Sequence, residues 1–288
     1  MNHPTFDRAL LNLRRQAASR RPAPGAEFLL TRALQEIDDR LPAFNKQFEV
    51  GVAMGGGAML TELLAKSDQC HTVLRAGAQF PAKDGDPVDP PSDDETLPLD
   101  DDSIDLAVSA MQLQFVNDLP GLLMQIRRAL RPDGLFMAIF IGGESLTELR
   151  QALAAAEAEI CGGISPRVAP MVELRDLGTL LQRAGFALPV VDVDRVTARY
   201  DTLFHLVGDL RAMAATNILT DRLKRPPPRQ LFLRAAQIYQ DQFSDADGRI
   251  RATFDILCAT GWAPHDSQQK PLAPGSAQIP LADVLKKK

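Results

Sequence analysis

A short apolar segment that runs into three consecutive glycines constrains the fold of this chain more than any other feature. The segment Phe48–Met54 enters Gly55-Gly56-Gly57, and a helical pattern follows at Ala58–Lys66. The order strand, glycine turn, helix is compatible with a nucleotide or nucleoside site, because glycine allows a tight bend and close approach of the backbone to a ligand. Plain loop chemistry produces the same order, so both interpretations stay open at this point.

The alternation of strands and helices continues along the chain. Apolar segments of strand length occur at His71–Ala76, Ile104–Met111, Gly134–Gly142, Pro189–Tyr200 and Ile250–Gly261. Helical spacing of apolar residues predicts helices at Glu144–Ala158, Leu174–Ala184, Leu203–Ala215 and Pro228–Phe243, and at Pro120–Leu130. This alternation predicts an α/β fold with a parallel, doubly wound sheet.

The chain divides into three predicted parts. Residues 1–45 form a helical segment that Pro22, Pro24 and Gly25 break into two helices. Residues 46–264 form the main domain, with a helical insertion at about 201–245. Residues 265–288 are rich in Pro, Ser and Lys, which predicts a loosely ordered tail.

Composition narrows the classes of partner and compartment. The chain has 288 residues, 45% of them hydrophobic, and a net charge of −5, which argues against a nucleic-acid partner and favours a small molecule or a protein. Cys70, Cys161 and Cys258 lie too far apart in sequence for a metal-ligand pair or a dense disulfide framework, so we expect a reducing cytoplasm. Without an apolar run near ~20 residues, no transmembrane segment is expected.

Ligands of doubly wound sheets bind outside the carboxyl ends of the strands, which is where the glycine turn falls. The acidic loop that contains Asp93 and Asp94 precedes the third predicted strand, and a carboxylate there could accept a hydrogen bond from an adenine amino group; a solvated loop is the plainer interpretation. Met111 and Leu113 are expected to form an apolar cleft wall. The four histidines are scattered, so we predict no metal site and identify no catalytic constellation.

Several motifs together resemble class I S-adenosylmethionine-dependent methyltransferases. Beside the glycine turn, these are Phe6-Asp7-Arg8, Leu97-Pro98, Ile104-Asp105-Leu106, Leu113–Pro120 and Leu130–Gly134. Later motifs resemble the mitochondrial complex I assembly factor five family and its bacterial relatives: Gly142–Arg150, Ser165–Pro170, Asp176-Leu177-Gly178, Arg183–Phe186 and Gly275-Ser276-Ala277. The resemblance covers nearly the whole chain.

The resemblance implies a seven-stranded Rossmann-like sheet whose last strand inserts antiparallel. It implies S-adenosylmethionine as the cofactor, a subunit of the respiratory NADH dehydrogenase as the protein partner, and either methyl transfer or arginine hydroxylation as the reaction. Phe6-Asp7-Arg8 resembles the start of the mature family domain rather than a presequence. We therefore expect a bacterial cytoplasmic protein, either free or at the periphery of the inner membrane.

The resemblance also identifies cofactor positions at which this chain departs from the family. The family's acidic residue at the end of the first strand is here Gly51, the first glycine of the turn is Ala53, and Gly55 and Gly57 keep the other two. The acidic residue that binds the ribose is replaced by Gly77. Each lost charge-assisted hydrogen bond would cost about 1.5–3 kcal/mol, or roughly one to two orders of magnitude in affinity.

Two retained or altered positions complete the comparison. Asp93 matches the adenine-contacting position, with Asp94 beside it, whereas the family's frequent histidine is here Gln114, which cannot act as a base. Two functions stay open. One is an S-adenosylmethionine-dependent enzyme, and the other is a non-catalytic assembly factor that no longer binds the cofactor. If the pocket is otherwise intact, restoring aspartate at positions 51 and 77 and glycine at 53 should create cofactor affinity.

Overall fold

The computed structural model describes residues 3–76 and 95–269. Its strands are β1 (Phe48–Gly55), β2 (Cys70–Ala76), β3 (Ile104–Ala110), β4 (Leu130–Gly142), β5 (Ala187–Tyr200) and β6 (Ile250–Trp262). Its α-helices are α1 (Arg8–Ser19), α2 (Phe28–Arg40), α3 (Gly57–Lys66), α4 (Leu119–Ala129), α5 (Thr147–Cys161), α6 (Leu174–Arg183), α7 (Leu203–Ala212) and α8 (Arg229–Phe243). The short 3-10 turns are η1 (Leu41–Phe44) and η2 (Leu113–Phe115).

The predicted strands and helices are confirmed, with ends that differ by a few residues. The largest difference is at β4, which begins at Leu130 rather than at Gly134 because Leu130 pairs with Ile104 of β3 across an irregularity in the register. Residues 131–133, which lie between the predicted helix and the predicted strand, are therefore part of β4. Prediction from local composition misses this because the pairing partner lies far away in sequence.

The strands form one mixed sheet in the order β2-β1-β3-β4-β6-β5. β1 pairs in parallel with β2 and β3, and β3 pairs in parallel with β4. β6 lies antiparallel to both β4 and β5, so the expectation of an antiparallel last strand is confirmed. The expected number of strands needs correction, because the described residues supply six strands rather than seven.

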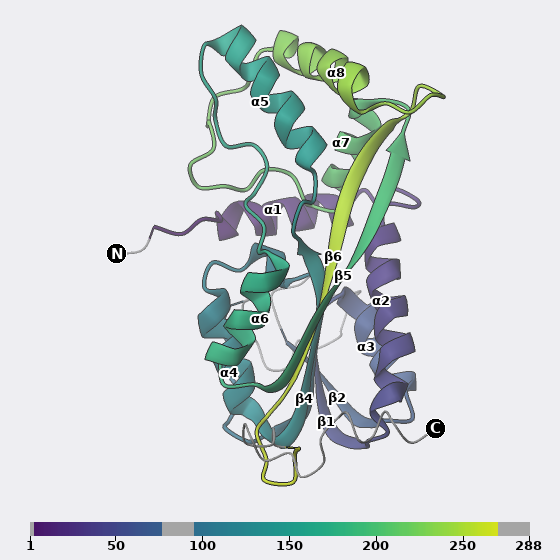
Figure 1. Cartoon of the computed structure of the whole chain (residues 1–288), viewed down its shortest axis with the longest axis vertical. Helices are drawn as coiled ribbons and strands as arrows, with labels where there is room; N and C mark the ends of the chain where they lie inside the picture. Colours follow the sequence, from purple (N-terminus) through teal and green to yellow (C-terminus); the bar gives the residue numbers. More distant parts are fainter. Residues whose placement is uncertain (1–2, 77–94, 270–288) are drawn as a thin grey trace, which may run out of the picture.

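Helices cover both faces of the sheet (Figure 1). The helices α2 and α3 pack on one face, and their buried residues join those of α5, α7 and α8 in one hydrophobic core. The helices α4 and α6 pack on the opposite face over a second core. Coverage of both faces explains why β4 is buried almost from end to end after Gly134.

A separate helical layer lies beyond one end of the sheet, at the top of Figure 1. It consists of α5, α7 and α8, and the long strands β5 and β6 extend into it. Arg234 of α8 binds Glu159 of α5, and the Tyr239 hydroxyl donates to the Arg251 carbonyl of β6 at 2.8 Å. These contacts fix the layer above the carboxyl ends of β1, β3 and β4. The predicted division into residues 1–45, 46–264 and 265–288, with a helical insertion at about 201–245, stays a prediction.

Within the described part of the chain, no helix combines the length and the apolar character needed to cross a membrane.

Candidate functional site

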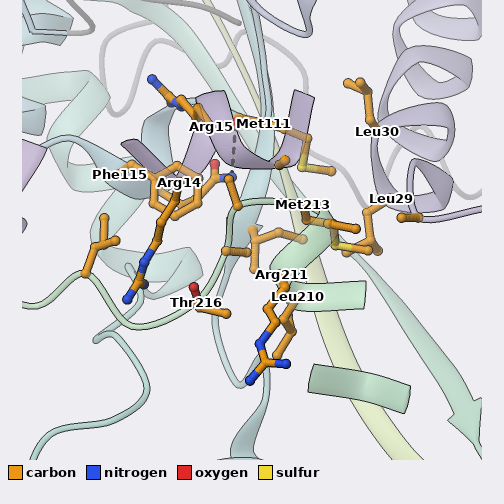
Figure 2. Close-up of a pocket in the computed structure, with 18 of the residues that line it drawn as sticks. Arg14, Arg15, Leu29, Leu30, Met111, Phe115, Leu210, Arg211, Met213 and Thr216 are labelled. Carbon is orange, nitrogen blue, oxygen red and sulfur yellow. Dashed lines mark hydrogen bonds between the residues drawn. The ribbon is translucent and has the colours of Figure 1, made fainter. Parts of the chain in front are cut away.

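A cavity of about 680 Å³ lies between the carboxyl ends of the parallel strands and the helical layer. Figure 2 shows side chains from α1, α2, α7 and the segment after β3 arranged around it. The glycine turn forms one part of its wall, and the apolar residues of α5, α7 and α8 form another. A concave, mainly apolar site of this size at this edge of an α/β sheet is where a ligand is expected.

The glycine turn has a backbone that side chains would not tolerate. Gly55, Gly56 and Gly57 all have left-handed conformations, with φ values of 71°, 68° and 61°. A Cβ atom on Gly55 would lie 2.1 Å from the Ala110 carbonyl oxygen, so the turn is packed directly against the end of β3. A Cβ on Gly57 would meet nothing within 4 Å. The turn thus presents bare backbone to the cavity at the start of α3, as close approach to a ligand requires.

Two of the predicted cofactor residues do not reach the cavity. Gly51 and Ala53 lie inside β1, are buried, and are not part of the cavity wall, whereas Gly55 and Gly57 are. A Cβ on Gly51 would lie 2.6 Å from the Sγ atom of Cys70 on the neighbouring strand. Aspartate at position 51 would therefore have to displace the Cys70 side chain, and whether it would create cofactor affinity stays a prediction.

The predicted residues Gly77, Asp93 and Asp94 lie outside the described residues. The last described side chains of β2 are Arg75 and Ala76, and both are buried. The roles of Gly77 at the ribose and of Asp93 and Asp94 at the adenine stay predictions.

Met111 and Gln114 border the cavity just after β3. Met111 has a left-handed φ of 52°, a strained conformation for a residue other than glycine, and such strain is common at functional sites. The Gln114 Nε2 atom donates to the Met111 carbonyl at 3.0 Å. The Oε1 atom of Gln114 is buried and has no hydrogen-bond partner among the described residues. A ligand with an N–H donor would remove the cost of about 1–3 kcal/mol that an unsatisfied acceptor carries.

Sequence reasoning missed the arginines of the site. Arg14 and Arg15 on α1, Arg167 before α6 and Arg211 at the end of α7 border the cavity, and among residues 3–76 and 95–269 Glu27 is the single acidic residue that borders it. The adjacent pair Arg14-Arg15 was the available signal, but it lies about forty residues before the glycine turn. Only the fold of α1 across the strand ends brings them together (Figure 1).

Three of the arginines at the cavity, Arg14, Arg15 and Arg167, have defined contacts. The Arg15 guanidinium lies 5.9 Å from the centre of the Phe115 ring, and Arg14 donates to the Asn217 carbonyl at 2.6 Å. Arg167 binds Glu157 at 2.6 Å, and this carboxylate is 3% exposed. Burial opposes ionisation of Glu157, but hydrogen bonds from Arg167 and Ser165 outweigh it and lower the pKa of the carboxyl group. The Glu157 carboxylate therefore holds Arg167 at the cavity as a charged pair.

A second buried carboxylate fixes the roof of the cavity to the sheet. Asp255 of β6 accepts hydrogen bonds from Arg195 at 2.6 and 2.9 Å and from the Glu144 backbone amide at 2.9 Å. The Ser145 hydroxyl donates to the Gly142 carbonyl at 2.6 Å and accepts from the Asp255 amide. These bonds position the segment that leads from β4 into α5, whose residues Leu149 and Leu153 line the cavity.

The residues present fit the cofactor only in part. The glycine turn and the unsatisfied Gln114 acceptor fit a nucleoside ligand that carries N–H donors, and Arg14 or Arg211 could hold a carboxylate. At Gly51, where the family resemblance implies an acidic anchor, a side chain would first have to displace the Cys70 Sγ atom. Whether the site lacks an acidic anchor stays a prediction.

Comparisons with known proteins identify relatives of this chain. A family described as "Methyltransferase domain" matches residues 48–138. The rat arginine-hydroxylase NDUFAF5, a mitochondrial protein, is 35% identical over 288 residues, which covers 98% of this chain and 84% of the rat protein. The zebrafish protein of the same name is 42% identical over 195 residues, covering 68% of this chain and only 60% of its own length.

A solved structure supports the fold. The YcgJ protein from Bacillus subtilis has a TM-score of 0.54 and 14% identity, and the match covers 82% of this chain and 99% of that protein. Identity at this level shows the architecture alone. The match to the rat protein, at 35% identity over 98% of this chain, shows the family. This chain belongs to the methyltransferase-fold family of the mitochondrial arginine-hydroxylase NDUFAF5.

Proposed function

We propose that this protein acts on a subunit of the respiratory NADH dehydrogenase during assembly of that complex, through a methyltransferase-type site with a degenerate cofactor loop. The proposal follows from membership of the NDUFAF5 family, whose rat and zebrafish members are named arginine-hydroxylases. Methyl transfer and arginine hydroxylation are both chemistries of such a site. S-adenosylmethionine, when bound, would supply an activated methyl group.

One observation carries the proposal: the glycine turn and the helical layer share a single cavity. The turn, with its three left-handed glycines, is the part suited to a nucleoside cofactor. The helical layer supplies the part suited to a second molecule, which such a reaction requires beside the cofactor. Placing two reactants in one water-excluding cavity is the main contribution that a group-transfer site has to make.

The alternative is a non-catalytic assembly factor, and the packing at Gly51 favours it. At Gly51, where the resemblance implies the acidic anchor, a Cβ atom would lie 2.6 Å from the Cys70 Sγ atom, so a carboxylate there would require the Cys70 side chain to move. Loss of one charge-assisted contact weakens a ligand by roughly one to two orders of magnitude. A cofactor of micromolar affinity would then bind only weakly.

Isothermal titration with S-adenosylmethionine and S-adenosylhomocysteine tests the cofactor part. Micromolar binding would mean that other groups replace the missing anchors, and it would support the enzyme. No binding at millimolar ligand would contradict cofactor use and leave the assembly factor.

A blocking variant separates the two functions in cells. Ala58 borders the cavity in the first turn of α3 and is exposed, so Ala58→Trp should fill the glycine end without disturbing the core. The matched control is Ala158→Trp on an exposed position of α5 away from the cavity. The measurement is NADH:quinone oxidoreductase activity in membranes from cells that carry each variant as the sole copy.

We expect Ala58→Trp to reduce this activity at least tenfold and Ala158→Trp to leave it unchanged. Full activity with Ala58→Trp, together with loss of cofactor binding, would refute cofactor-dependent catalysis and favour the non-catalytic factor. Equal loss in both variants would point to general damage and contradict the assignment of the glycine end as the functional part.

A further inference from the structure

The part of the cavity under the helical layer is lined by large apolar side chains. Its walls are side chains from α5, α7, α8 and β6: Leu149, Leu153, Leu203, Val207, Leu210, Phe232 and Phe254. Most of these residues are buried as deeply as the hydrophobic core, and Leu203 and Phe254 are 2% exposed. We call this part the apolar chamber.

An apolar chamber without an occupant is unfavourable. Protein interiors are close-packed, and an apolar cavity lowers stability in proportion to its volume. The chamber is nevertheless framed by well-ordered contacts, such as the Tyr239 hydroxyl on the Arg251 carbonyl and the Arg234–Glu159 pair between α8 and α5. These contacts fix the positions of the helices around the chamber, so its apolar walls point to an apolar ligand rather than to poor packing.

The charges around the cavity indicate what the ligand carries at its polar end. Among the residues that the structure describes, four arginines and one glutamate border the cavity, in a chain whose net charge is −5. Arg167 is neutralised by Glu157, but within residues 3–76 and 95–269 the Arg211 guanidinium forms no hydrogen bond or ion pair. Burial, and then the neighbouring Arg222, lower the pKa of Arg14. An anion at this place would relieve the repulsion.

The two arginines lie where the chamber opens. Arg211 follows Leu210, which lines the chamber from α7, and Arg14 faces the same segment through its bond to the Asn217 carbonyl. In Figure 2 both guanidinium groups extend toward the lower side of the view, whereas Arg15 extends toward the upper side. An anionic head group at Arg14 and Arg211 would leave an attached chain free to enter between α5, α7 and α8.

We propose that the chamber binds an amphiphile of the fatty-acid type, with its acyl chain among the apolar residues and its anionic head group at Arg14 and Arg211. The inference goes beyond the proposed function and does not depend on whether the cofactor binds.

Fluorescence of cis-parinarate, a fatty acid that emits when it enters an apolar site, provides the test with the purified full chain. We expect micromolar binding that palmitate displaces at least ten times better than hexadecanol, since only palmitate has a charged head group. If palmitoyl-coenzyme A displaces parinarate at lower concentrations than palmitate does, the natural ligand is a thioester-linked acyl group. If palmitate is the stronger competitor, the ligand is a free fatty acid.

Two variants locate the ligand. Arg211→Gln, at an exposed position, should weaken the binding of palmitate about tenfold and leave the binding of hexadecanol unchanged. Arg175→Gln, at an exposed position of α6, serves as the control. Val207→Trp should fill the chamber and reduce parinarate binding at least tenfold, with Ala158→Trp as its control. Circular dichroism establishes that each variant is folded.

Absence of displaceable parinarate binding in the folded wild type would overturn the proposal. Equal competition by palmitate and hexadecanol, or no effect of Arg211→Gln, would overturn the anionic head group. Loss of parinarate binding in Ala58→Trp but not in Val207→Trp would place the ligand at the glycine end and overturn the chamber. Titration of the same variants with S-adenosylhomocysteine reports separately on the cofactor, so failure of one proposal is distinguishable from failure of the other.

Discussion

Replacing Gly51 by aspartate restores the acidic residue of the family pattern on paper, and we expect it to destabilise the protein without creating cofactor affinity. The Cβ atom alone would lie 2.6 Å from the Cys70 Sγ atom and 3.6 Å from the Leu106 side chain. Because Sγ is one torsion from the Cys70 backbone, the steric part should sit near the low end of the 1–3 kcal/mol cost of overpacking. Gly51→Ala is therefore expected to lower the free energy of unfolding by about 1 kcal/mol.

Charge raises this cost for aspartate. An uncompensated buried charge typically destabilises by about 3–5 kcal/mol. For a chain of this size that corresponds to a fall in Tm of roughly 6–20 °C, at about 2–4 °C per kcal/mol. The penalty should shrink as the pH is lowered, because protonation removes the buried charge. Gly51→Asn, similar in shape and neutral, separates the steric part from the charge.

Urea unfolding and titration with S-adenosylhomocysteine measure the two consequences on the same preparation. A double-mutant cycle of Gly51→Ala with Cys70→Ala should show a coupling of about 0.5–3 kcal/mol, because both changes act on one contact. Wild-type stability of Gly51→Asp together with increased cofactor affinity would refute the reasoning, since it would mean that the strand pair opens at no cost and that the anchor position is still competent.

The remaining predictions concern the roof of the cavity and the thiols. Asp255→Asn should lower the free energy of unfolding by about 1–2 kcal/mol at pH 7, toward the low end of charge-assisted bonds because the Arg195 side chain is 60% exposed. The Arg195 hydrogen bond holds the pKa of Asp255 below its usual value near 3.8, so the wild-type advantage is present above that pH and is lost as the pH falls further; a difference in urea midpoints that does not narrow as the pH is lowered below 3.8 would contradict this. Iodoacetamide should label only Cys161 in the native protein, because Cys161 is exposed whereas burial raises the pKa of Cys70 and raises that of Cys258 to about 12. Mass spectrometry checks this, and rapid native labelling at Cys258 would show that β6 is not buried as described.

Much of the secondary structure follows from local sequence. Apolar segments of strand type, alternating with segments of helical periodicity, predict β1 to β6 and their helices, because burial of one or both faces imposes these periods. The glycine turn is predictable for the same reason, since three adjacent glycines permit left-handed φ values that other residues avoid. The presence of a ligand site at this turn is thus readable from the chain.

The content of that site was decided by the tertiary structure. The sequence aligns Gly51 with an acidic anchor, but only the pairing of β1 with β2 places Cys70 against it and closes the space. Likewise, Arg14 and Arg211 are nearly two hundred residues apart, and no local pattern relates them until α1 crosses the strand ends and α7 packs beside it. Periodicity determines which face of an element is buried, whereas the neighbours that fill or line a space depend on contacts between segments distant in the chain. For this reason the sequence by itself determined the elements and the turn, and only the folded structure decided the shape and the charge of the cavity.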